Sequence, residues 1–122
     1  MASSVSVPSF AHSNLDAYRV AREALVRGEA VAAVLPRGHA NLADQLRRAL
    51  LSAHLGIAEG ASRTGADRVA RFRCSRAEVS EAAAALEAVA LLGLAPKPEV
   101  EAVIQLLGRV YAMLTRLVKP AR

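Results

Sequence analysis

The chain has 122 residues, of which 53% are hydrophobic, 22% are charged and 3% are aromatic. This length suits one domain with one buried core and excludes a large multidomain enzyme. Alanine (27 residues) and leucine (16 residues) dominate the apolar set, which favours helices over strands. The scarcity of aromatic residues argues against a module that stacks nucleic-acid bases on exposed rings.

The single cysteine, Cys74, excludes an internal disulfide framework and a multi-cysteine zinc site. The longest apolar stretch, residues 82–95, contains Glu87 and is too short to cross a membrane. Residues 1–10 carry neither a basic segment nor an apolar core, so no secretory signal is predicted. We expect a cytoplasmic protein in a reducing compartment.

The net charge of +5 is divided into blocks along the chain. Residues 1–36 are neutral, residues 37–76 carry +5, residues 77–108 carry −4 and residues 109–122 carry +4. Of the 16 basic residues, 14 are arginine, which forms paired hydrogen bonds to phosphate and carboxylate. Two interpretations stay open, a solvated face and a face that binds a polyanion.

The first two predicted helices follow a loose arm at residues 1–12. The first helix begins at Ser13, whose hydroxyl is expected to cap it, and ends before Pro36. The second begins at Asn41 as its cap and ends at Gly60 in the left-handed conformation. Apolar residues recur at three- and four-residue spacing in both segments, as expected of amphipathic helices.

The third predicted helix begins at Thr64 and runs to Gly93. Arg76 falls on its apolar face, which indicates that this face reaches an edge of the core. After a proline-containing break, the fourth helix begins near Pro98, which suits a first helical turn, and ends at Lys119.

Short breaks between these segments predict an all-α fold, an antiparallel up-down four-helix bundle of residues 13–119 with a tail at residues 120–122. Phe72 and Tyr111 fall on apolar stripes. They are therefore expected in the core or in an interface, and not as base-stacking residues.

The sequence offers little for catalysis or metal binding. A di-iron bundle needs two Glu-x-x-His motifs, and none of His12, His39 and His54 has a glutamate three residues before it. Cys74 lies near arginines that would stabilise a thiolate, but a lone helical cysteine is more often a packing residue. No phosphate loop, nucleophile elbow or triad spacing occurs. We expect no enzymatic activity, no metal and no cofactor.

The most distinctive motif lies in residues 41–76. It reads Asp44-Gln45-Leu46-Arg47-Arg48-Ala49, then Ser52, then Ile57-Ala58-Glu59-Gly60. This motif resembles the four-helix-bundle family of bacterial 23S rRNA intervening-sequence proteins, over roughly residues 14–119. The chain departs from the family pattern at two places. It has Gly56 where the family has asparagine, and Ser-Arg-Ala-Glu at residues 75–78 where the family has Ala-Arg-Gly-Ser.

The resemblance implies a homopentameric barrel of four-helix bundles and no settled biochemical activity. A related branch is the accessory protein of diversity-generating retroelements, a basic pentamer that binds a reverse transcriptase and nucleic acid. The implied partners are therefore further copies of the chain, RNA or DNA, and a reverse transcriptase, with no membrane. The family's basic positions match at Arg47, Arg48, Arg63 and Arg68.

Six arginines are the candidate nucleic-acid-binding residues: Arg47, Arg48, Arg63, Arg68, Arg71 and Arg73. They would contact phosphates, which position a protein without reading base sequence. The alternative hypothesis is a protein-interaction scaffold. In that case the basic residues 37–76 pair with the acidic residues 77–108 of a neighbouring subunit.

Structural roles are predicted for four motif residues: Gln45, Ser52, Glu59 and Gly60. Gln45 is expected to form an interhelical hydrogen bond. Glu59 is expected to pair with Arg63 four residues later, or to brace Arg47 or Arg48 across the bundle.

Overall fold

The computed structural model describes residues 9–119. Its elements are α1 (Asp16–Ala33), the 3-10 turn η1 (Arg37–His39), α2 (Ala40–Ala61), α3 (Gly65–Leu91) and α4 (Lys97–Leu117). These described residues contain no strand. The tail predicted at residues 120–122, and residues 1–8 of the predicted arm, lie outside the described residues.

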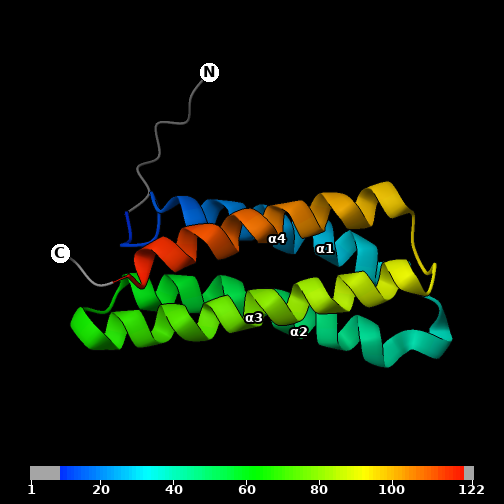
Figure 1. The fold of residues 1–122 in the computed structure, drawn as a ribbon, viewed down its shortest axis with the longest axis horizontal. Helices are drawn as coiled ribbons and strands as arrows, with labels where there is room; N and C mark the ends of the chain where they lie inside the picture. The colour runs from blue at the N-terminus through cyan, green and yellow to red at the C-terminus, as the bar shows by residue number, and fades with distance from the viewer. Residues whose placement is uncertain (1–8, 120–122) are drawn as a thin grey trace, which may run out of the picture.

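The four long helices lie side by side (Figure 1). Both α2 and α4 pack against α1 and against α3, so each helix contacts two neighbours. The α1–α2 and α3–α4 connections lie at one end of the molecule, and the α2–α3 turn lies at the other (Figure 1). The predicted all-α four-helix bundle is confirmed. Within residues 9–119, no helix is long and apolar enough to span a membrane.

The core is aliphatic, with one aromatic ring in it. Phe72, Leu46, Ile57, Leu86 and Leu114 are fully buried, whereas α1 contributes only alanine, valine and glycine. Burying each large side chain stabilises the fold by about 1.5–3 kcal/mol. The helical spacing of these residues therefore determines which face of each helix points inward. The prediction that Phe72 lies in the core is confirmed.

Glycines allow α2 to approach its neighbours closely. A Cβ at Gly60 would lie 2.7 Å from two ring atoms of Phe72 on α3. On the other side of α2, the Leu50 side chain occupies the space where a Cβ of Gly28 on α1 would lie. These glycines are needed inside helices, where the absence of a side chain makes room for a core residue.

The predicted left-handed stop at Gly60 is therefore wrong. Gly60 is buried inside α2, which continues to Ala61. Ser62 follows as the C-cap, and its hydroxyl donates a hydrogen bond to the carbonyl oxygen of Glu59 at 2.8 Å. Among the described residues, only Gly65 and Gly93 have positive φ, at 59° and 66°.

Gly93 ends α3 as predicted. Its N–H donates to the carbonyl of Ala90 at 3.1 Å, and the N–H of Leu94 donates to the carbonyl of Val89 at 3.0 Å. This pair of bonds is the Schellman closure, and it requires the left-handed conformation that glycine adopts without steric cost.

Two predicted helix starts are wrong. α1 begins at Asp16, and the Ser13 hydroxyl accepts a hydrogen bond from the Phe10 N–H at 2.9 Å, so it serves the preceding turn. Asn41 lies inside α2, because η1 leads directly into the helix at Ala40. Thr64 precedes α3 as predicted, but its side chain makes no capping hydrogen bond.

At the end of the predicted loose arm, His12 packs against Tyr18 of α1, whereas residues 9–11 are exposed. The rings of Phe10, His12, Tyr18 and His54 follow one another, with centroid distances of 5.7, 4.4 and 4.6 Å. His54 Nδ1 is buried without a hydrogen-bond partner in the described part of the chain. Burial, and then the charges of Arg22 and His12, lower the pKa of His54.

Candidate nucleic-acid interface

The arginines of α3 point in different directions because the helix turns by about 100° per residue. Residues two positions apart do not share a face. Arg71 therefore reaches toward α2, where it pairs with Glu59. Arg73 reaches toward α4, where it lines a hollow together with Tyr111.

Arg71 is inserted between α2 and α3. Its Nε donates to Glu59 Oε1 at 2.7 Å, and its Nη1 donates to the Ser75 hydroxyl at 3.4 Å and lies 3.8 Å from Glu78 Oε1. The side chain is only 18% exposed. Gly56 makes this insertion possible, because a Cβ there would overlap the Arg71 guanidinium and the Ser75 hydroxyl.

The two carboxylates beside Arg71 respond to it differently. The hydrogen bond and charge of Arg71 lower the pKa of Glu59. Burial raises the pKa of Glu78 and outweighs the attraction of Arg71, because Glu78 Oε1 is buried without a hydrogen bond to any described residue. In return, Glu59 raises the pKa of Arg71 through the shared hydrogen bond.

Three further candidate arginines have partners within the chain. Arg68 Nη1 donates to the carbonyl of Ala61 at 3.1 Å, and the guanidinium lies 5.0 Å from the Phe72 ring centroid. Arg47 pairs with Glu29 of α1 through Nε at 2.8 Å and Nη2 at 2.9 Å. Arg63, which precedes α3, lies 3.4 Å from Asp67 in the first turn of that helix.

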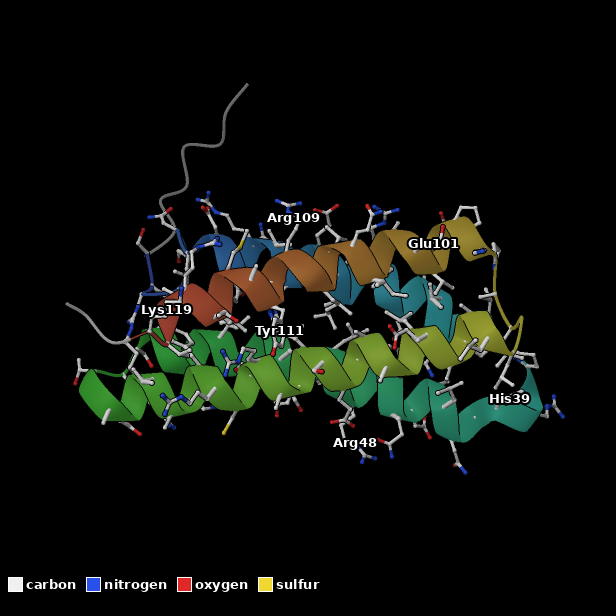
Figure 2. The ribbon with its side chains drawn as sticks, in the orientation of Figure 1. His39, Arg48, Glu101, Arg109, Tyr111 and Lys119 are labelled. Carbon is white, nitrogen blue, oxygen red and sulfur yellow. The ribbon has the colours of Figure 1, made fainter. Side chains whose placement is uncertain are left out.

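Arg48 and Arg73 are exposed and form no ion pair with the described residues. Figure 2 shows Arg48 pointing away from the bundle, on the side opposite Arg109. The six candidate arginines therefore do not form one surface. Four contribute to contacts within the chain, and two are presented to solvent from different helices.

Arg76 is not one of the six candidate binding residues, although the sequence places it on an apolar helix face. The structure places Arg76 half-buried at the α3–α4 edge, as that position predicted. Its guanidinium lies 5.6 Å from the ring centroid of Tyr111. Tyr111 is 44% exposed, so it does not lie in the core of the chain, and of the two predicted places only an interface stays open.

The motif residues have mixed outcomes. Glu59 pairs with Arg71, so the predicted pairing with Arg63, Arg47 or Arg48 is wrong. Gln45 is exposed and makes no side-chain hydrogen bond within residues 9–119, so the expected interhelical bond is not formed there. Ser52 is half-buried on α2.

Cys74 is exposed on α3, so the expected packing role is wrong. The preceding residue, Arg73, lines the α3–α4 hollow. Because successive helical positions point in different directions, Cys74 does not line it. No group of three or more His, Cys, Asp and Glu side chains in residues 9–119 is placed to hold a metal ion.

A sequence model of the 23S rRNA-intervening sequence proteins matches residues 13–116. The chain belongs to this family. No individual curated protein matches the chain significantly.

The Ile-Ala-Glu-Gly motif holds α2 against α3. Ile57 is fully buried, Glu59 pairs with Arg71, and Gly60 lies under the Phe72 ring. Gly56, which directly precedes this motif, accommodates the Arg71 guanidinium.

Proposed function

We propose that this protein is a non-enzymatic homo-oligomer that binds the phosphate backbone of RNA or DNA without reading its sequence. The observation that carries the proposal is that exposed Arg48 and Arg73 have no carboxylate partner among residues 9–119. The chain also carries a net charge of +5. Unneutralised arginines of this kind attract polyanions and bind their phosphates.

The proposed assembly is a homopentameric barrel of antiparallel up-down bundles. Its support is the family resemblance and an exposed apolar hollow of about 520 Å³ on α1 and α2, lined by Leu25, Val26, Glu29, Arg47 and Leu51. Val26 is 66% exposed and Leu51 is 47% exposed, and contiguous exposed apolar residues mark interaction sites. A reverse transcriptase, or a setting within a ribosomal RNA insertion, is proposed from the resemblance alone.

The test is binding of a fluorescently labelled single-stranded RNA, followed by anisotropy over a series of salt concentrations. We expect unrelated RNA sequences to bind equally well, because phosphate contacts carry no sequence information. The logarithm of the affinity should fall with the logarithm of salt concentration by about 0.7 for each phosphate neutralised. Absence of binding at low salt, or an affinity independent of salt, would contradict the proposal.

A second candidate function is a protein-interaction scaffold, and the apolar hollow on α1 and α2 favours it. Arg71 forms ion pairs within its own chain, so ion pairs between subunits would have to use other arginines. A scaffold held by arginine–carboxylate pairs should dissociate as salt rises. An assembly held by apolar contacts should persist at salt concentrations that release RNA.

Sedimentation of Val26→Glu measures the contribution of this hollow. The substitution places a charge beside Leu51 without disturbing the core, because Val26 is exposed. We expect the variant to form a smaller assembly and to keep the circular dichroism spectrum of the unsubstituted protein. Ala112→Glu, on an exposed position of α4, is the matched control and should leave the assembly intact.

A further inference from the structure

A hollow of about 500 Å³ lies between α3 and α4, and charged and polar side chains line it. Arg73 and Arg76 lie one turn apart on α3, and Ser80 follows one turn later on the same face. Alanines on this face leave space that longer side chains would fill. Tyr111 of α4 lines the opposite wall, and Figure 2 shows it between the two helices.

Arg76 is oriented without being neutralised. Its Nη1 donates to the Thr115 hydroxyl at 3.3 Å, and that hydroxyl donates to the Tyr111 carbonyl at 2.9 Å. The Arg76 guanidinium lies against the Tyr111 ring, and its Cζ is 5.6 Å from the ring centroid. No carboxylate of residues 9–119 forms an ion pair with Arg76. A guanidinium that is already ordered loses less entropy when it binds an anion.

The charges in the hollow fit one compact anion. Two guanidinium groups and a hydroxyl can each donate to the oxygens of a phosphate, which accepts several charge-assisted hydrogen bonds. Glu81 lines the same hollow further along α3. Its negative charge disfavours a second anion at that end, so the site suits a single phosphate group near Arg73 and Arg76.

We propose that this hollow, the α3–α4 groove, binds one phosphate group, supplied by the nucleic-acid backbone. Arg73 and Arg76 are the cationic ligands, and Ser80 is a hydroxyl donor. Thr115 and Tyr111 are positioning residues for Arg76. The inference rests on the proposed function and specifies where on the molecule the backbone is held.

The first test compares RNA binding by two double variants that lose the same charge. Arg73→Gln with Arg76→Gln removes the groove cations, and Arg109→Gln with Arg116→Gln removes two exposed arginines of α4 outside the groove. We expect the groove variant to lose about tenfold or more in affinity, and the salt dependence to decrease by about 0.7 for the lost phosphate contact. The control should lose about threefold or less, as expected of long-range charge alone. A single variant, Arg73→Gln, changes only an exposed residue and keeps the Arg76 contacts. Its RNA affinity should fall by less than that of the double groove variant.

The second test uses inorganic phosphate and no nucleic acid. The chain has no tryptophan and two tyrosines, so Tyr18→Phe leaves Tyr111 as the emitter. Phosphate binding at Arg76 should change the Tyr111 emission in a saturable way, because the guanidinium lies against the ring. The change should be absent when Arg73→Gln and Arg76→Gln are added.

The outcomes separate this inference from the proposed function. If the groove variant binds RNA as well as the control does, the groove proposal is overturned while the proposed function stands. If RNA does not bind to the unsubstituted protein but phosphate changes the Tyr111 emission, the anion site stands and the proposed function fails. If the groove variant keeps its RNA affinity and loses its assembly, the groove holds a neighbouring copy's carboxylate and the proposal is overturned.

Discussion

The two sides of α3 use arginine in opposite ways. On the side facing α2, Arg71 is 18% exposed and contacts Glu59, Glu78 and Ser75. On the side facing α4, Arg73 is exposed and has no ion pair with the described residues. The two arginines are two positions apart in one basic block of the sequence. Their roles differ because the helix directs them to different neighbours.

This difference shows that a block of charge along a helix is not a charged surface. The +5 of residues 37–76 divides into arginines that hold helices together and arginines that remain available to a ligand. A test that removes Arg68 and Arg71 together would therefore damage the fold. It would not distinguish an interface from a binding site, and variants must be chosen by face.

The largest expected loss of stability comes from a substitution where α2 packs against α3. Gly60→Ala places a Cβ 2.7 Å from the Phe72 ring, which is fully buried. We expect a loss of about 1–3 kcal/mol in the free energy of unfolding, as for other overpacked cores, measured by urea denaturation. Gly108→Ala is the matched control, because nothing lies within 4 Å of the added Cβ. It should stabilise α4 by up to about 1 kcal/mol. Equal effects at the two sites would refute the close approach of α2 and α3.

A smaller effect is expected from removing the Arg71 charge. Arg71→Met keeps much of the volume but leaves the Glu78 carboxylate and the Ser75 hydroxyl without their partner. We expect a loss of about 1–2 kcal/mol in the free energy of unfolding, measured by urea denaturation. Arg73→Met, at an exposed position, should change the stability by less than about 0.5 kcal/mol. Similar losses in both variants would show that the two sides of α3 are not distinct.

The smallest effect, and the most diagnostic in sign, comes from the carboxylates beside Arg71. Glu59 has a lowered pKa, so its charged form is favoured in the fold and Glu59→Gln should destabilise at neutral pH. Glu78 has a raised pKa, so Glu78→Gln should stabilise at neutral pH.

The pH dependence of these two variants provides the check. The Glu59 contribution is present above the ordinary glutamate pKa and is lost as pH falls through its lowered pKa, because the group is then protonated in both states. The difference between Glu59→Gln and the unsubstituted protein should therefore disappear in acid. Effects of the same sign for Glu59→Gln and Glu78→Gln would contradict the described geometry around Arg71.

Periodicity predicted the four helices and most of their core, because apolar spacing reports directly which face turns inward. Local signals at helix ends were less reliable. Gly93 ends α3 as predicted, whereas Gly60 serves tertiary packing against Phe72 and does not end α2. A single sequence does not distinguish these uses, since both require a glycine.

The same limit applies to the candidate site. The sequence identified the basic segment that contains Arg71 and Arg73, but the assignment of partners depends on how α3 is rotated against α2 and α4. Arg76 was the informative exception. A charge on an otherwise apolar stripe indicated an edge, and that edge is where the α3–α4 groove lies.

The most direct test of the account is the RNA affinity of Arg71→Gln and Arg73→Gln, measured side by side under conditions where both are folded. The two variants lose the same charge two residues apart on one helix. We predict that Arg73→Gln binds RNA several-fold more weakly than Arg71→Gln, whose affinity should stay close to that of the unsubstituted protein. Equal losses of affinity in the two variants would show that the arginines act as an undivided pool of charge and would contradict the account.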